Sequence, residues 1–239
     1  MKEERCAYCD RPATTRDHVP PEKLFTPPRP SNLITVSSCG SCNHGASYDD
    51  EVFRNELSIM AGSFGESAKA AERLQTALRG IRRNRATRRR MVLSAQPVER
   101  YSTSGLYLGL GYAVLAAPGV QKRVITRIVR GLYWYHIGSR VPDDAKIELV
   151  FIDKRKPDWE EGLTLLRPLM LRHILIGDGE TFQYCYGQAN DDPTFSVWLL
   201  IFFKSTAEQI VLVHTARNTD AGSVEEHSGP CHQRHIENP

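Results

Sequence analysis

The spacing of hydrophobic and polar residues predicts a short strand and two helices in the first third of the chain. Five prolines between positions 20 and 30 exclude a helix there, and the extended run 32–36 favours a β-strand. Apolar residues recur at helical spacing over 47–60, where Ser47 and Asp50 resemble a capping box. A second helical pattern covers residues 67–81.

The pattern of the second half predicts one long helix and several strands. Residues 120–137 place apolar side chains on one helical face, with Pro118 just before the start and Gly138 at the end. Aromatic residues alternate over 182–186, as in a half-buried strand. The expected strands are 147–152, 182–186, 196–203 and 210–214. We therefore predict an α+β fold with a mostly antiparallel sheet.

These elements divide the chain into four expected parts. They are an N-terminal module (1–62), a helical basic linker (63–98), an α+β domain of unknown role (99–215) and a polar tail (216–239). The tail holds Cys231, His232 and His235, which could bind a metal, but its composition is more typical of a disordered segment.

Composition narrows the class of protein. The 239 residues carry 31 Lys and Arg against 28 Asp and Glu, a net charge of +3 that does not by itself indicate nucleic-acid binding. The longest apolar stretches are far shorter than the ~20 residues that cross a bilayer, and no signal peptide opens the chain. The chain has no phosphate loop either. We therefore expect a soluble, cytoplasmic protein that does not associate with a membrane and has no nucleotide cofactor.

Four of the six cysteines form two C-x-x-C pairs, Cys6/Cys9 and Cys39/Cys42. In a chain without a signal peptide, such pairs indicate a metal site before disulfides. Four thiolates would bind one structural zinc and stabilise a segment too short to build its own core. The 29 residues between Cys9 and Cys39 exceed the ~15–20 of an ordinary zinc ribbon, so an additional segment lies between the pairs.

That segment carries Asp17-His18, then Asn32-Leu33, and the second cysteine pair is followed by Asn43. The order C-x-x-C, D-H-x-x-P, N-L, C-x-x-C-N resembles the HNH endonucleases, over about a quarter of the chain. The resemblance implies that residues 1–62 form a zinc-stabilised ββα-metal nuclease module.

The residue types suit phosphodiester hydrolysis, which needs a base for water and a cation for the leaving oxygen. Histidine titrates near neutral pH, and aspartate is an oxygen ligand for Mg²⁺ or Mn²⁺. The resemblance implies that His18 activates water, that Asn32 steadies His18, and that Asp17 and Asn43 bind the catalytic Mg²⁺ or Mn²⁺.

The chain departs from the family pattern around the second cysteine pair. Ala46 stands where many members carry Lys or Arg, and His44 could replace Asn43 as a ligand. Asp49 and Asp50 open the helix that follows, where the helix dipole favours acidic residues, so we interpret them as capping residues.

Two other groups have both a functional and a structural interpretation. A dense basic stretch is either a solvated face or a surface that contacts DNA phosphates, and its candidate residues are Arg82, Arg83, Arg85, Arg88, Arg89 and Arg90. The aromatic run Tyr133–Tyr135, with Arg130 and Arg140, could stack on bases but more often belongs to a core, as does Trp198.

The predicted function is a metal-dependent DNA endonuclease whose second domain selects the substrate or a protein partner. Modules of this kind occur in restriction, phage-defence, homing and mobile-element proteins, and the sequence does not choose among them. Two alternatives stay open: a catalytically silent zinc-binding module for nucleic acid or a protein, and a nuclease subunit active only within a larger complex.

Overall fold

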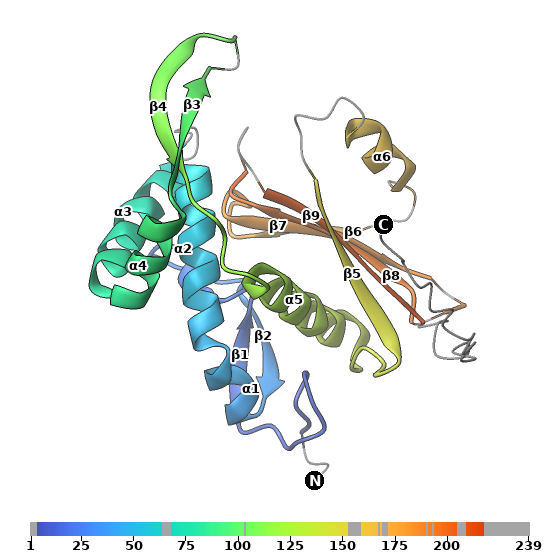
Figure 1. The fold of residues 1–239 in the computed structure, drawn as a ribbon. Coiled ribbons are helices and arrows are strands. Elements are labelled where there is room, and N and C mark those ends of the chain that lie inside the picture. The colour runs from blue at the N-terminus through green and yellow to red at the C-terminus, as the bar shows by residue number, and fades with distance from the viewer. Residues whose placement is uncertain are drawn as a thin grey trace, which may run out of the picture.

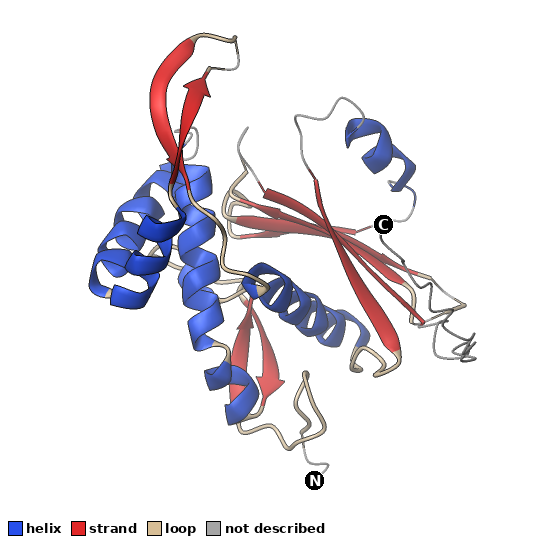
Figure 2. Ribbon diagram, in the orientation of Figure 1, coloured by secondary structure: helices blue, strands red, loops and turns tan. Residues whose placement is uncertain are grey.

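The computed structural model (Figures 1 and 2) describes residues 4–63, 68–102, 104–152, 159–166, 168, 172–189, 191–192, 194–204 and 209–217. Its elements are β1 (Thr15–Val19), η1 (Glu22–Leu24), β2 (Ile34–Ser38), α1 (Gly40–Gly45), α2 (Ser47–Ser63), α3 (Ala68–Arg83), α4 (Arg85–Ser94), β3 (Gln96–Tyr101), β4 (Tyr107–Ala113), α5 (Val120–Ile137), β5 (Ala145–Ile152), α6 (Trp159–Leu166), β6 (Arg172–Ile176), β7 (Phe182–Gln188), β8 (Ser196–Phe202) and β9 (Gln209–Arg217).

The strands form three antiparallel sheets. β1 pairs with β2, β3 pairs with β4, and the third sheet has the order β5-β9-β8-β7-β6. Helix α5 lies between the β1–β2 ribbon and the five-stranded sheet, and the β3–β4 ribbon projects away from the remaining elements (Figure 1). The mixed α+β fold with antiparallel sheets is therefore confirmed.

Helix α5 joins the N-terminal part to the large sheet. Its apolar face is fully buried at Ile125, Val129 and Leu132, in one core cluster that extends from Ala7 to Val213. At Gly131 a Cβ atom would lie 2.6 Å from a Val19 methyl, so only glycine lets α5 approach β1 this closely. The parts expected as separate domains thus share one hydrophobic core.

A polar cluster fixes the C-terminal end of α5 to the sheet. The ring nitrogens of His136 lie 2.8 Å from the Tyr184 hydroxyl and 2.9 Å from the Tyr186 hydroxyl. Burial, with a smaller effect of Arg172, lowers the pKa of His136 to about 4, so the ring is neutral and shares hydrogen bonds with both tyrosines. Trp198 is fully buried and stacks on Tyr186, which confirms its assignment to the core.

Most expected elements are present, with shifted ends. The predicted helix 120–137 coincides with α5, and 47–60 lies within α2. The predicted strand 32–36 begins two residues too early, because residues 31–32 form a turn before β2. Residues 216 and 217 were expected in the tail and instead end β9, where they pair with β5. The possible tail metal ligands Cys231, His232 and His235 lie outside the described residues.

The basic stretch folds into more structure than its charge indicated. α3 packs along α2, and the six candidate arginines lie at the end of α3 and along α4. Asn84 lies between the two helices, and its side chain caps α4 by accepting a hydrogen bond from the Thr87 N–H. The expected linker, 63–98, therefore contains two packed helices.

Asn32 connects the N-terminal segment to the large sheet. Its amide nitrogen donates to the Leu175 carbonyl at 2.9 Å, and its amide oxygen accepts from the Gly177 N–H at 2.8 Å. We expect Asn32→Ala to lower the free energy of unfolding by about 1–2 kcal/mol, because two hydrogen bonds are lost at an exposed position. Urea denaturation measures this, with the neighbouring Ser31→Ala as control. Equal stabilities of the two variants would contradict the connecting role.

Candidate metal centre and catalytic residues

The four cysteines lie together at the N-terminal end of the fold. Cys6 and Cys9 belong to the segment before β1, Cys39 precedes α1 and Cys42 lies within it. All four sulfur atoms are within 4.8 Å of one another, and the Sγ of Cys9 is 3.7 Å from that of Cys39 and 3.6 Å from that of Cys42. Zn–S bonds of about 2.3 Å in a tetrahedron place sulfurs about 3.8 Å apart, so the group fits a metal such as zinc.

Arg11 adjoins this cluster on its exposed side. Its Nε lies 3.5 Å from the Cys9 sulfur, and another guanidinium nitrogen donates to the Ser41 hydroxyl at 3.0 Å. The hydrogen bond from Arg11 lowers the pKa of Cys9 to about 6. Burial, and then the neighbouring thiols, raise the pKa of Cys42 to about 12. The cluster thus already contains one readily ionised thiol.

Strand β1 directs Asp17 and His18 to opposite faces, as alternation requires. Asp17 points inward and is only 5% exposed. One carboxylate oxygen accepts a 2.7 Å hydrogen bond from the Tyr8 hydroxyl and lies 3.2 Å from Nε of Arg127. The other oxygen is 3.3 Å from an Arg127 terminal nitrogen. Burial, and then Asp17, raise the pKa of Tyr8, so this hydroxyl remains a donor.

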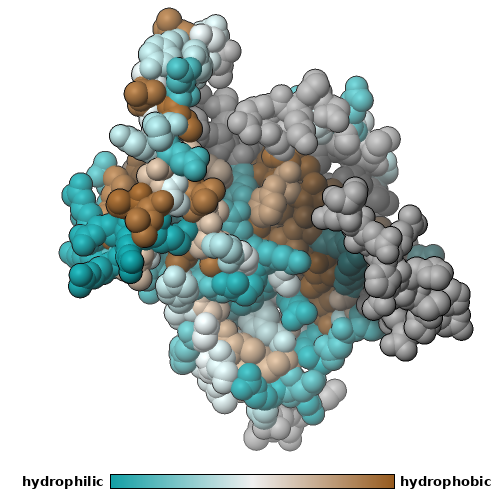
Figure 3. Space-filling model, viewed as in Figure 1, coloured by the Kyte–Doolittle hydropathy of each residue, from teal (hydrophilic) through white to brown (hydrophobic). Residues whose placement is uncertain are grey.

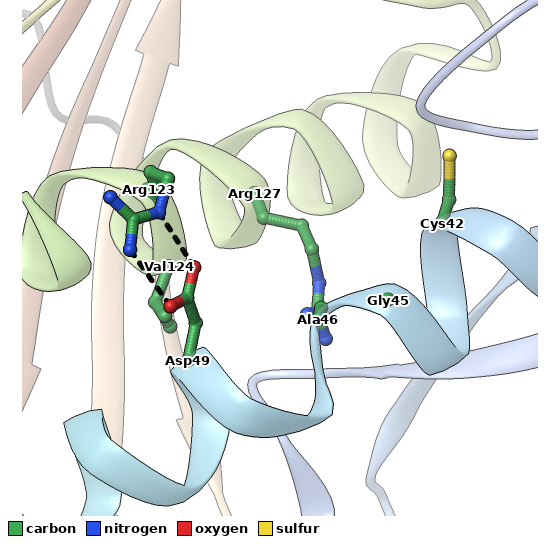
Figure 4. A pocket seen from close by; sticks show the side chains of 7 residues that line it. All are labelled: Cys42, Gly45, Ala46, Asp49, Arg123, Val124 and Arg127. Atoms are coloured by element: carbon green, nitrogen blue, oxygen red, sulfur yellow. Dashed lines mark hydrogen bonds and ion pairs between the residues drawn. The ribbon is translucent and has the colours of Figure 1, made fainter.

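Arg127 and Arg123 of α5 bind the two acidic residues at the start of α2. Arg127 pairs with Asp50 at 3.0 Å, and Arg123 makes two contacts of 2.7 and 2.8 Å with Asp49 (Figure 4). Burial raises the pKa of Asp50 despite Arg127, whereas the hydrogen bond from Arg123 lowers that of Asp49. These acids, expected as capping residues, also hold α2 against α5.

Asp17 and Asn43, which we expected to bind the catalytic cation, lie at or beside β1, but each already interacts with other protein groups. The Asn43 amide nitrogen donates to the Arg16 carbonyl at 3.0 Å and to the Thr15 hydroxyl at 3.2 Å, which places Asn43 beside β1. Both oxygens of Asp17 are occupied, and Arg127 supplies the positive charge. In this arrangement the pair does not fit Mg²⁺ or Mn²⁺. Within the described ranges, the cysteines are the only group of three or more His, Cys, Asp or Glu close enough to bind a metal.

His18 lies on the other face of β1, where its side chain is 34% exposed. Its Nδ1 is 3.9 Å from a carboxylate oxygen of Glu22 in η1, and Glu22 pairs with Arg29 at 3.2 Å. Asn32, expected to steady His18, uses both ends of its amide in the bonds to the β6–β7 turn. In the described structure, Glu22 is the charged group that faces His18.

A basic groove runs along α5, on the side of β1 that carries Asp17. One open cavity of about 400 Å³ is lined by Tyr8, Cys42, Lys122, Arg123, Thr126, Arg127 and Arg130. A second cavity of about 230 Å³ (Figure 4) shares Cys42, Arg123 and Arg127 with it. From the sequence we expected Cys42 only as a zinc ligand and Arg130 only as a residue that could contact bases, and we did not expect a groove. The spacing of Arg123, Arg127 and Arg130 nevertheless places them on one helical face.

The six candidate arginines differ in their surroundings. Arg90 pairs with Glu56 at 2.9 Å and donates to the Leu115 carbonyl at 3.0 Å, so it fixes the segment after β4. The other five are exposed on α3 and α4, namely Arg82, Arg83, Arg85, Arg88 and Arg89. Of the six candidates, these five are available to an external anion.

Comparison of the chain with protein-family models, curated proteins and solved structures finds no match. Among the described residues, no helix has the length and apolar character needed to cross a membrane.

We expect Cys39→Ser to remove bound zinc and lower the free energy of unfolding by several kcal/mol, because metal binding contributes directly to folding of such a segment. Metal analysis and thermal denaturation of the purified chain measure both effects. The control is Cys185→Ser, a partly buried cysteine of β7 outside the cluster. Unchanged zinc content in Cys39→Ser would show that the four cysteines do not form the site.

We expect Arg127→Gln to destabilise the fold by about 3–5 kcal/mol near neutral pH, because it leaves buried carboxylates without a counter-ion. Burial already raises the pKa of Asp50, and removing Arg127 raises it further. A carboxyl whose folded pKa is raised loses stability as pH rises through that pKa, so the deficit should shrink on acidification. Urea denaturation at neutral and mildly acidic pH measures it.

The control for this substitution is Arg123→Gln. Its ion pair with Asp49 has an arginine side chain that is 57% exposed, so the expected loss is about 1 kcal/mol or less. Equal losses in the two variants, or a deficit at Arg127 that does not change with pH, would contradict the buried ion cluster.

Proposed function

We propose that this chain is an endonuclease that hydrolyses phosphodiester bonds of DNA, with His18 as general base. The observation that carries the proposal is a solvent-accessible histidine on β1 of a β1–β2–α unit that is closed by four clustered cysteines. A basic groove lies along α5, on the side of β1 that carries Asp17. The resemblance of the motif order to HNH endonucleases supports the same function.

In this proposal His18 accepts the proton of the attacking water through Nε2. The Glu22 carboxylate faces Nδ1 from 3.9 Å, a distance that is too long for a hydrogen bond but common for catalytic groups before substrate binds. A carboxylate on that nitrogen orients the ring and favours the tautomer with a free Nε2. Glu22 is thus the positioning residue for His18.

The groove along α5 supports nucleic acid as the substrate class. Lys122 and Arg130 are exposed and have no acidic partner within the described part of the chain, whereas Asp49 and Asp17 offset Arg123 and Arg127. Unpaired cations in a groove provide phosphate contacts, which give affinity without sequence preference.

The structural observations support the expected zinc ion more strongly than the expected Mg²⁺ or Mn²⁺. The cysteine cluster fits zinc, which we propose as a structural ion that fixes α1 against the first cysteine pair. Mg²⁺ or Mn²⁺ at Asp17 and Asn43 remains a hypothesis from the resemblance, because it requires Arg127 to release Asp17. No step of the proposed reaction is derived from that ion.

The ion pair between Asp17 and Arg127 also favours a second candidate function. A module that binds nucleic acid or a protein without cleaving it has no need of a free carboxylate at this position. A nuclease subunit whose partner displaces Arg127 would show the same resting geometry.

We expect the purified chain to nick or linearise supercoiled plasmid in Mg²⁺ or Mn²⁺, and His18→Ala to reduce the rate at least ~100-fold through loss of the base. His214→Ala is the matched control. His214 is another histidine 35% exposed, and its Nε2 lies 3.0 Å from Glu148, but it lies on β9 of the large sheet. A reaction with EDTA tests the requirement for a divalent cation.

A fluorescent oligonucleotide separates binding from cleavage. We expect the double variant Lys122→Ala/Arg130→Ala to bind more weakly and with a shallower salt dependence, and His18→Ala to bind normally. Binding without cleavage in the wild-type chain would support the silent module. Equal cleavage by wild type and His18→Ala would contradict the assigned base.

A further inference from the structure

The β3–β4 ribbon exposes an unusual number of large hydrophobic side chains. No other described helix or strand packs extensively on either strand, and the ribbon projects from the molecule (Figure 1). Figure 3 shows hydrophobic residues along it. Six of its side chains are between 51 and 76% exposed, namely Tyr101, Leu106, Tyr107, Leu108, Leu110 and Tyr112. An isolated two-stranded ribbon is at best marginally stable in water, and further strands or a packed helix stabilise it.

The exposed hydrophobic area is large enough for a stable interface. Ten large hydrophobic side chains are 39–76% exposed, seven of them on the ribbon and its turn and three, Val92, Leu93 and Leu115, on the segments that flank it. At roughly 100 Å² each they present on the order of 1,000 Å², compared with the ~800 Å² per partner of a standard interface and the ~300–600 Å² of the largest patch on a typical monomer.

The two edges of the ribbon differ in chemistry. β3 carries Pro97, Glu99 and Arg100, and proline and charges are the usual protection of an edge strand against pairing. β4 has the sequence YLGLGYA, with no proline and no charge. The β4 edge is therefore open to another strand, and two β4 edges would meet without repulsion between like charges.

The rest of the chain offers little to cover this surface. The 22 residues after Arg217 include only two aliphatic residues larger than alanine, Val224 and Ile236. The internal segments outside the described ranges are short, and apart from the apolar segment 169–171 they are mostly polar. A second copy of the ribbon supplies hydrophobic area of matching size.

We propose that β4 pairs antiparallel with β4 of a second copy of this chain, joining the two ribbons into a four-stranded sheet. Leu110 is the middle residue of β4 and lies at the two-fold axis. This register places Leu108 of one copy opposite Tyr112 of the other, apolar against apolar. The inference does not depend on the nuclease proposal.

Sedimentation equilibrium of the full chain over a range of concentrations tests the dimer. We expect Leu110→Lys to raise the dissociation constant at least tenfold, because it places two charges together at the axis. The matched control is Leu78→Lys on the exposed face of α3, where Leu78 is 38% exposed. Circular dichroism establishes that both variants are folded. A wild-type chain that is monomeric throughout, or a dimer unaffected by Leu110→Lys, would overturn the proposal.

A photo-crosslinking residue at Tyr112 tests the register directly. In a mixture of ¹⁵N-labelled and unlabelled chains, we expect mixed-isotope products that join position 112 to residues 106–110. Products confined to one isotope would mean that the chain covers its own ribbon. Mixed products that map elsewhere would mean a different dimer, and either result contradicts the β4–β4 pairing.

Discussion

The buried ion cluster of Arg127 with Asp17 and Asp50 is the interaction on which the rest of the structure depends. It ties β1 and the start of α2 to α5, and Tyr8 adds a donor from the first cysteine pair. Two largely buried carboxylates this close together are tolerable only with a cation between them. Helix α5, more than sixty residues downstream, therefore neutralises the buried acidic side chains of the N-terminal segment and also supplies part of its hydrophobic core.

Because of this ion cluster, the two faces of β1 differ in their chemistry. On the inner face Asp17 is neutralised and has a structural role. On the outer face His18 stays accessible, with Glu22 near one ring nitrogen. A chemical role for Asp17 requires that something replace Arg127, whereas a role for His18 requires only that water and a phosphate reach it. His18 is thus accessible to solvent, whereas Asp17 is engaged in an ion pair.

Local signals predicted the local features. Gly138 adopts a left-handed conformation at the end of α5, and the glycine and proline around its ends gave the correct bounds. The cysteine spacing predicted the cluster because the motif is local. The partner of Asp17 lies 110 residues away, and no periodicity encodes such a distance. The β3–β4 ribbon was missed because its strands have no buried face, so its hydrophobic residues do not show the usual alternation.

The close contact at Gly131 bears on how this architecture could be rearranged. Because β1 rests directly on the backbone of α5, the cysteine-rich segment does not end in a surface of its own. Grafted onto another protein, it would need a helix with a glycine and an arginine one turn apart, in the same orientation. Gene fusion or domain shuffling would have to transfer α5 together with the cysteine-rich segment. The unit that can be transferred is therefore larger than the cysteine motif itself.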